Sequence, residues 1–141
     1  MNLPRRAVSA EELNQAATGH LPGLLGIEFL GGEPGRMAAR LPIGPDLLAH
    51  NGYLHAASIV ALADTCAGFG CMVSLPEGRT GFTTVELKTN FTGTTLEGEI
   101  RCEARLAHGG RRTQVWDATV SDAATGRDIA LFRCTQMLLG G

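Results

Sequence analysis

The chain has few aromatic side chains and almost no excess charge of either sign. Aromatic residues make up 5% of the 141 residues, and the formal net charge is -2 at pH 7. The arginines are scattered along the chain rather than clustered, so the sequence lacks the basic surface that nucleic-acid-binding proteins use. We therefore expect no nucleic-acid partner.

Apolar runs that mark export or membrane insertion are also missing. Glu11 and Glu12 lie where a secretory signal would continue into an apolar run. The longest apolar segment, 56–73, is interrupted by Asp64 and contains glycine and serine, which argues against a membrane span. The sequence predicts a cytoplasmic protein without a membrane partner.

The four cysteines, Cys66, Cys71, Cys102 and Cys134, form no C-x-x-C pair and have no histidine at zinc-ligand spacing. We interpret them as reduced thiols that act as small core residues. Cys66 lies two positions after Asp64, but no histidine near it in sequence supports a cysteine nucleophile. We expect no metal site and no cofactor.

The chain length fits one domain, which we place at 1–141. Its first 20 residues are predicted to be a helical segment. Ser9, followed by Glu12 three positions later, is a capping box for a short helix that ends at Gly19.

The remaining pattern predicts one long helix and about six antiparallel strands. The helix is expected at about His55–Val73, where Pro76 and Gly78 follow and end it. The strands are expected at 24–30, 36–41, 80–91, 97–107, 112–121 and 127–138. The glycine-rich segment 31–35 is predicted to join the first two strands by a loop rather than a tight two-residue turn. Together these elements indicate an α+β fold in which a curved antiparallel sheet wraps a single helix.

Asp64 is the most informative residue, because it interrupts an otherwise apolar helix. A buried carboxylate without partners costs several kcal/mol by order of magnitude, so either structure or chemistry must require it. On a helical wheel Asp64 points away from a bulky stripe that should face the sheet. That stripe consists of Ile59, Leu62, Cys66 and Phe69.

The helix face around Asp64 is made of small residues. Within about 60° of Asp64 on an ideal wheel lie Ala57, Val60, Ala61, Ala67, Gly68 and Cys71. A face this small lets a second backbone approach closely, and the natural neighbour is the same helix of a second copy across a two-fold axis. The sequence thus predicts a dimer with Asp64 at the seam.

Several motifs resemble those of a known family. They are Asn51-Gly52-Tyr53-Leu54-His55-Ala56-Ala57, Leu62-Ala63-Asp64, Glu86-Leu87-Lys88-Thr89-Asn90-Phe91, and His108-Gly109-Gly110-Arg111-Arg112 with Asp122 and Gly126 downstream. In these motifs the chain resembles the hotdog-fold acyl-CoA thioesterases of the phenylacetate-pathway type, over about 24–138. The resemblance implies a hotdog fold, an acyl-CoA substrate, and a homodimer or homotetramer with active sites between subunits.

The resemblance also implies roles for individual residues. In the family a carboxylate nine residues after a His-Gly-Gly turn is catalytic, which places that role on Asp64, as nucleophile or general base. The backbone N–H near Ala56 then serves as the oxyanion donor, and His55 shapes the turn. Since His55 and Asp64 lie about 180° apart on an ideal wheel, one subunit cannot readily aim both at one carbonyl, whereas a partner subunit can.

Two departures from the family pattern affect the turn and the loop before it. Ala56 and Ala57 stand where the family has two glycines, which keeps the N–H groups but adds methyl groups. The family often has Asn or Gln six residues before the histidine, where this chain has Ala49, and Asn51 is offset by two positions. The candidate substrate-binding residues are Asn51, Gly52, Ala57, Gly68, Thr83, Arg111 and Arg112, of which the two arginines are candidates for holding CoA phosphates.

Each candidate also has a purely structural interpretation. Asp64 can be a satisfied interfacial carboxylate, and His55 a helix cap bonded to the loop. The alternative functions are a non-catalytic acyl-CoA-binding protein, favoured if the alanine methyls block the oxyanion position, and a hydratase or dehydratase. The hydratase class usually pairs its Asp with a His five residues later, where this chain has Phe69. A small aryl or medium-length acyl group is our expectation for the substrate.

Overall fold

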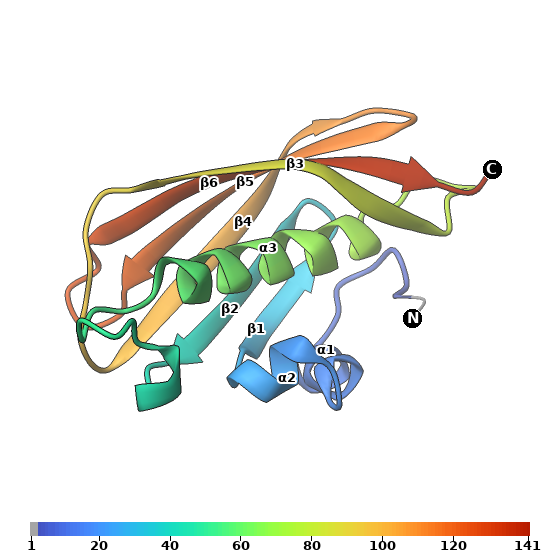
Figure 1. Ribbon diagram of the computed structural model, residues 1–141. Helices are drawn as coiled ribbons and strands as arrows, with labels where there is room; N and C mark the ends of the chain where they lie inside the picture. The colour runs from blue at the N-terminus through green and yellow to red at the C-terminus, as the bar shows by residue number, and fades with distance from the viewer. Residues whose placement is uncertain (1–2) are drawn as a thin grey trace.

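The computed structural model describes residues 3–141, in which a curved six-stranded sheet wraps around one long helix (Figure 1). The strands are β1 (Glu28–Glu33), β2 (Arg36–Pro42), β3 (Gly81–Phe91), β4 (Glu99–Gly109), β5 (Thr113–Asp122) and β6 (Asp128–Leu139). The helices are α1 (Ala10–Ala17), α2 (Leu21–Leu25) and α3 (Ala56–Val73), with a 3-10 turn η1 (Pro45–Leu47). The predicted α+β architecture is confirmed.

The sheet order is β1-β2-β4-β5-β6-β3, and all neighbouring strands are antiparallel. β3 follows α3 in the chain and pairs with β6 at one edge of the sheet, whereas β1 lies at the other edge (Figure 1). At the β1 edge Val8 pairs with Gly32 through two backbone hydrogen bonds of 2.8 and 3.2 Å. Within residues 3–141 no segment covers the outer edge of β3.

The concave face of the sheet is filled by α3. Ile59, Leu62 and Cys66 are buried against the strands, and the Phe69 ring lies 4.4 Å from the Phe29 ring of β1. The predicted stripe therefore faces the sheet as expected, with Phe69 only partly buried. By length and composition α3 is apolar enough to cross a membrane, but 56% of it is buried inside the chain, as in the core helix of a globular domain.

A buried polar network fixes the C-terminal end of α3. The Gln114 amide donates to the Ser74 carbonyl at 3.0 Å, and the Trp116 indole N–H donates to Gln114 at 2.8 Å. The Ser74 hydroxyl accepts the Gly35 N–H at 2.9 Å. Because each buried polar group finds a partner, the network ties the helix end to β5 and to the β1–β2 turn without an uncompensated desolvation cost.

The N-terminal segment contains one confirmed prediction and one wrong one. Ser9 caps α1 and accepts the Glu12 N–H at 3.2 Å, as the capping box predicts. The strand expected at 24–30 is wrong at its start, because α2 occupies Leu21–Leu25 and β1 begins only at Glu28. Proline in the first turn and a left-handed Gly26 (φ 87°) favour this short helix. Residues 1 and 2 of the predicted segment lie outside the described residues.

The β1–β2 connection is also tighter than predicted. Glu33 pairs directly with Arg36, so Pro34 and Gly35 form a two-residue turn instead of a longer loop. Gly35 has φ of 87°, a value that glycine tolerates and that follows proline in type II turns. The two preceding glycines are part of β1 rather than of the connection.

The predicted small face of α3 is open to a partner only in its N-terminal half. Ala67, Gly68 and Cys71 are buried within the chain, because the β3 and β6 side of the curved sheet covers this part of the helix. The Phe82 ring of β3, for example, lies 3.1 Å from the position a side chain at Gly68 would take. The remaining members of the face, Ala57, Val60 and Ala61, stay at least partly exposed.

Candidate active site

Asp64 borders a pocket of about 450 Å³ between α3, the start of β3 and α2. The other lining residues are Pro22, Thr65, Gly68, Phe69, Met72, Thr80, Gly81, Phe82 and Thr84. None of them carries a charge, so among the described lining residues Asp64 is the only ionisable side chain in an otherwise apolar and hydroxyl-bearing pocket. A concave apolar site with one polar focus is typical of small-molecule binding.

The Asp64 carboxyl has no compensating partner among the described residues. Its Oδ1 is buried, and within residues 3–141 it forms no hydrogen bond. Burial raises the pKa of Asp64 above its ordinary value. The nearby charges of Glu86, Lys88 and Arg133 do not offset this, because the strand register places them on the outer face of the sheet. The carboxylate is therefore a stronger base than an exposed aspartate.

His55 caps α3 rather than lying within it. Its Nδ1 accepts the Ala57 N–H at 2.9 Å, so Nδ1 carries no proton and the neutral ring holds its proton on Nε2. The Ala56 N–H, one residue earlier, has no acceptor within residues 3–141. This N–H lies at the positive end of the helix dipole and is free to stabilise a negative oxygen.

The two halves of the predicted site are separated in one chain. The eight residue steps along α3 from Ala56 to Asp64 correspond to a rise of about 12 Å. His55, Ala56 and Ala57 are exposed and do not line the Asp64 pocket. One thioester carbonyl therefore cannot reach both the Ala56 N–H and Asp64 of the same chain.

The loop before α3 holds Asn51 and Gly52. Asn51 Oδ1 accepts the Tyr53 N–H at 3.2 Å, and Gly52 has φ of 88°, which a turn requires of it here. These contacts account for both residues as loop formers. Asn51 is exposed.

Of two further predicted binding residues, Gly68 on α3 lies at the pocket and Thr83 on β3 points away from it. Gly68 lines the Asp64 pocket, as the prediction of a substrate contact requires. Thr83 pairs with the exposed Met137, so its side chain points to the opposite face of the sheet from Phe82 and Thr84. A contact of Thr83 with a ligand in this chain's own pocket is not supported by this placement.

Arg111 and Arg112 form the β4–β5 hairpin close to the Asp64 pocket. The Arg79 guanidinium donates to the Arg111 carbonyl at 2.9 Å, and the next residue, Thr80, lines the pocket. The Arg112 carbonyl accepts the Leu138 N–H at 2.8 Å, which fixes the hairpin against β6. This arrangement brings the backbone of the hairpin and Arg79 to one end of the pocket.

The cysteines are structural. All four are free and buried. Cys66 donates to the Met37 carbonyl at 3.3 Å, and burial is the main cause that raises the pKa of Cys71 and of Cys134 to about 12. Thiols with so high a pKa are poor nucleophiles at neutral pH, which argues against Cys71 and Cys134 as reactive groups.

Several pocket residues were not predicted from the sequence. Thr65, Met72 and the stripe residue Phe69 follow Asp64 along one side of α3, so helical spacing could have identified them. Phe82 and Thr84 come from β3, and they reach the pocket only because β3 lies at the sheet edge beside α3. No local pattern in the sequence predicts that contact.

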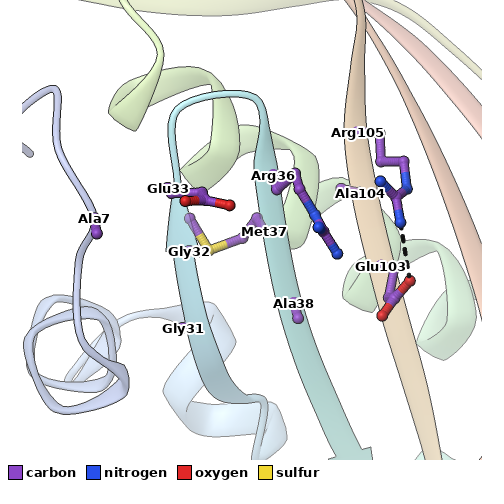
Figure 2. A pocket seen from close by; sticks show the side chains of 10 residues that line it. All are labelled: Ala7, Gly31, Gly32, Glu33, Arg36, Met37, Ala38, Glu103, Ala104 and Arg105. Atoms are coloured by element: carbon purple, nitrogen blue, oxygen red, sulfur yellow. Dashed lines mark ion pairs between the residues drawn. The ribbon is translucent and has the colours of Figure 1, made fainter.

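A second hollow, of about 320 Å³, lies over β1, β2 and β4 (Figure 2). Its charged lining residues are Glu33, Arg36, Glu103 and Arg105, and the last two form an ion pair of 3.8 Å. Asp64 does not line this hollow. This hollow is therefore separate from the candidate active site, and its lining charges are of both signs and partly paired.

Comparisons with known proteins identify the family of this chain. A model of the thioesterase superfamily matches residues 51–128. The 1,4-dihydroxy-2-naphthoyl-CoA hydrolase of Listeria monocytogenes is 29% identical over 111 residues, which are 79% of this chain and 89% of that protein. Among solved structures, a mutant of thioesterase PA1618 from Pseudomonas aeruginosa has a TM-score of 0.88 at 25% identity and covers 95% of this chain and 96% of its own.

The fold is also shared with the PaaI protein of Escherichia coli, from the phenylacetic acid degradation operon. Its TM-score is 0.80 at 20% identity, over 95% of this chain and 98% of that one. The chain therefore belongs to the thioesterase superfamily and has the hotdog fold. It is an enzyme of the thioester hydrolase class.

Proposed function

We propose that this protein hydrolyses an acyl-CoA to a free acid and CoA, with Asp64 as the catalytic carboxylate. The observation that carries the proposal is the unpartnered, buried Asp64 oxygen at the edge of an uncharged pocket. Such a carboxylate is costly to the fold, and thioester hydrolysis requires a base or nucleophile at this place. In either role Asp64 acts in its ionised form.

The active site is shared between two copies of the chain. The edge strand β3 is exposed, with Val85, Leu87 and Phe91 at 54%, 42% and 47%, and the N-terminal half of α3 is open beside it. A long uncovered apolar edge is a hazard for a monomer, and a second copy across a two-fold axis covers it. The Ala56 N–H of one copy then reaches the carbonyl served by Asp64 of the other. A homotetramer is two such dimers.

The two groups suit the two requirements of the reaction. As the thioester carbonyl becomes tetrahedral, its oxygen gains negative charge, which the Ala56 N–H and the helix dipole stabilise. Loss of one such donor typically costs about a hundredfold or more in rate. The leaving CoA thiolate is a good leaving group and takes a proton as it departs. His55 holds the turn by accepting the Ala57 N–H.

The pocket favours an uncharged acyl group. Phe69, Met72 and Phe82 provide apolar walls, and none of the described residues that line the pocket is a cation that could pair with a second carboxylate on the acyl chain. We expect aryl or medium-length acyl groups, in keeping with the naphthoyl-CoA named for the Listeria relative. Arg111 and Arg112 are suited to the CoA phosphates outside the pocket. The free thiols fit a reducing compartment such as the cytoplasm.

The proposal is tested by incubating the protein with benzoyl-, phenylacetyl-, hexanoyl- and glutaryl-CoA and measuring free thiol and product mass. We expect CoA release from the first three and little from glutaryl-CoA, whose carboxylate would face Asp64. Tight binding without CoA release would instead favour an acyl-CoA-binding protein. Addition of water without CoA release, tested with an enoyl-CoA, would favour a hydratase; the phenyl ring of Phe69 in the pocket, where that class has a histidine, argues against this outcome.

A further inference from the structure

The Asp64 pocket has three walls, and the one supplied by α2 is built differently from the other two. The α3 and β3 walls belong to the packed core, where the Phe82 ring lies 3.1 Å from the position a side chain at Gly68 would take. Of the residues of α2, only Pro22 lines the pocket. The extent of the pocket on this side therefore depends on one residue that lies outside the sheet and its central helix.

The short helix α2 is held by its two ends rather than by burial. None of its residues is buried, and Leu24 is 82% exposed. The elements on either side of α2 are joined instead, because Asn14 Oδ1 of α1 accepts the Phe29 N–H of β1 at 2.7 Å and Asn14 Nδ2 donates to the Phe29 carbonyl at 3.4 Å. Since α2 spans the gap between two fixed points and buries nothing, substitutions in it should cost the fold little.

Gly23 determines how closely α2 approaches α1. A side chain at Gly23 would lie 2.8 Å from the carbonyl oxygen of Ala17, the last residue of α1. Only a residue without Cβ allows this approach, so α2 rests directly on the backbone of α1. Ala17 is itself buried in the core. The contact therefore sets the place of α2, and with it the place of Pro22 in the pocket.

Pro22 presents a rigid apolar surface to a ligand. Its ring is half-buried, lacks a polar atom and is fixed to the backbone, so it can neither donate a hydrogen bond nor turn aside as a flexible side chain does. Such a ring acts on an acyl group by exclusion alone. An apolar pocket that admits or excludes one methylene group changes kcat/KM by about 10- to 200-fold.

We propose that Pro22 is the specificity-determining residue that limits the length of the acyl group, and that Gly23 is the residue that positions it. This inference rests on the proposed thioesterase function and deepens it, since it names the substrates as acyl-CoAs whose acyl group ends at the Pro22 ring. Neither residue takes part in hydrolysis. Both affect which thioester is cleaved rather than how it is cleaved.

The first test measures kcat/KM for acetyl-, hexanoyl- and decanoyl-CoA. Pro22→Ala removes the ring and should raise the decanoyl-to-hexanoyl ratio about tenfold or more, whereas Pro22→Phe enlarges the wall and should lower the hexanoyl-to-acetyl ratio by a similar factor. Pro45→Ala is the matched control, because Pro45 also lies in a one-turn helix but does not line this pocket. Unchanged ratios in both Pro22 variants, or an equal shift in Pro45→Ala, would overturn the proposal.

Gly23→Ala tests the positioning residue. Its new Cβ must displace α2 from Ala17, so we expect the decanoyl-to-hexanoyl ratio to change although Gly23 does not line the pocket. The kcat for acetyl-CoA should stay near the wild-type value. A residue that only supports the fold would lower the melting temperature and leave the ratio as it is, and that result would contradict the positioning role.

The second test uses hydrogen exchange in the wild-type protein with S-hexyl-CoA, a thioether that cannot be hydrolysed. We expect this thioether to protect the peptide 18–27 more strongly than CoA alone does, because only the thioether places an alkyl chain against α2. The peptide 43–49 around η1 should show no such difference. Equal protection of 18–27 by both compounds would overturn the proposal, whether or not the Pro22 variants fold. If no acyl-CoA releases CoA in the wild type, the proposed function fails instead, and the exchange experiment does not depend on that outcome.

Discussion

Two inactive variants should restore activity when they share a dimer. The first is Asp64→Asn, which removes the base. The second is Ala56→Pro, which removes one N–H and little else: this N–H has no acceptor within residues 3–141, Ala56 is the first residue of α3, and proline is favoured at that position. The preceding His55 has φ of -65° and ψ of 136°, a conformation that a following proline accepts.

The expected recovery follows from the geometry. Since about 12 Å of helix separates Ala56 from Asp64, each site takes one group from each subunit. In an equal random mixture, half of the subunits that supply Asp64 are intact at that residue, and half of their partners are intact at Ala56. About a quarter of the wild-type activity should therefore return, in dimers and tetramers alike. Hybrid dimers purified through two different affinity tags should have about half of the wild-type activity, because one of their two sites is intact.

The assay is CoA release after the two variants are co-expressed or refolded together. Each variant alone should lose about a hundredfold or more, and Ala56→Gly, which keeps the N–H, should remain active. Circular dichroism and sedimentation must show that Ala56→Pro is folded and dimeric. Absence of any recovery from verified hybrids would refute the shared site, because every site would then carry one defect within a single subunit.

Three further predictions concern stability, assembly and CoA binding. Burial raises the pKa of Asp64 above its ordinary value of 3.8, so ionisation of this carboxyl destabilises the fold as the pH rises from 3.8 through the raised pKa. At neutral pH, Asp64→Asn should therefore melt at a higher temperature than the wild type. This gain in melting temperature should disappear near pH 3.8. A gain that does not depend on pH would contradict this cause. Ala61→Trp puts a large ring on the open half of α3 and should dissociate the dimer in sedimentation, whereas an unchanged assembly with full activity would place the interface elsewhere. Replacing Arg111 and Arg112 with glutamine should raise KM for an acyl-CoA and leave KM for the matching acyl-pantetheine unchanged; equal effects on both esters would exclude phosphate binding.

Much of the fold could be predicted because strand alternation and helical periodicity are local signals. The stripe of Ile59, Leu62 and Cys66 places α3 against the sheet on its own. The strand prediction at 24–30 is wrong at its start, because an apolar run that leads into strand residues does not distinguish a one-turn helix from a strand. Pro22 and Gly26 mark the two ends of this helix and are stronger signals there than hydrophobicity.

Only part of the candidate site could be predicted from the sequence. Asp64 was identifiable because a carboxylate is out of place in an apolar helix, and Gly68 followed from helical spacing. Phe82 and Thr84 were not identifiable, because β3 reaches the pocket by crossing to the far edge of the sheet and pairing with β6. The choice of edge depends on the curvature of the whole sheet, which no short motif encodes.

The central claim is that Asp64 performs the chemistry of thioester hydrolysis, and kcat/KM of Asp64→Asn tests it most directly. The measurement uses the best acyl-CoA of the panel, with sedimentation to verify an intact dimer. We predict a fall of about a hundredfold or more, since asparagine keeps the shape and removes the basic oxygen. An unchanged kcat/KM in a folded, dimeric Asp64→Asn protein would contradict the account.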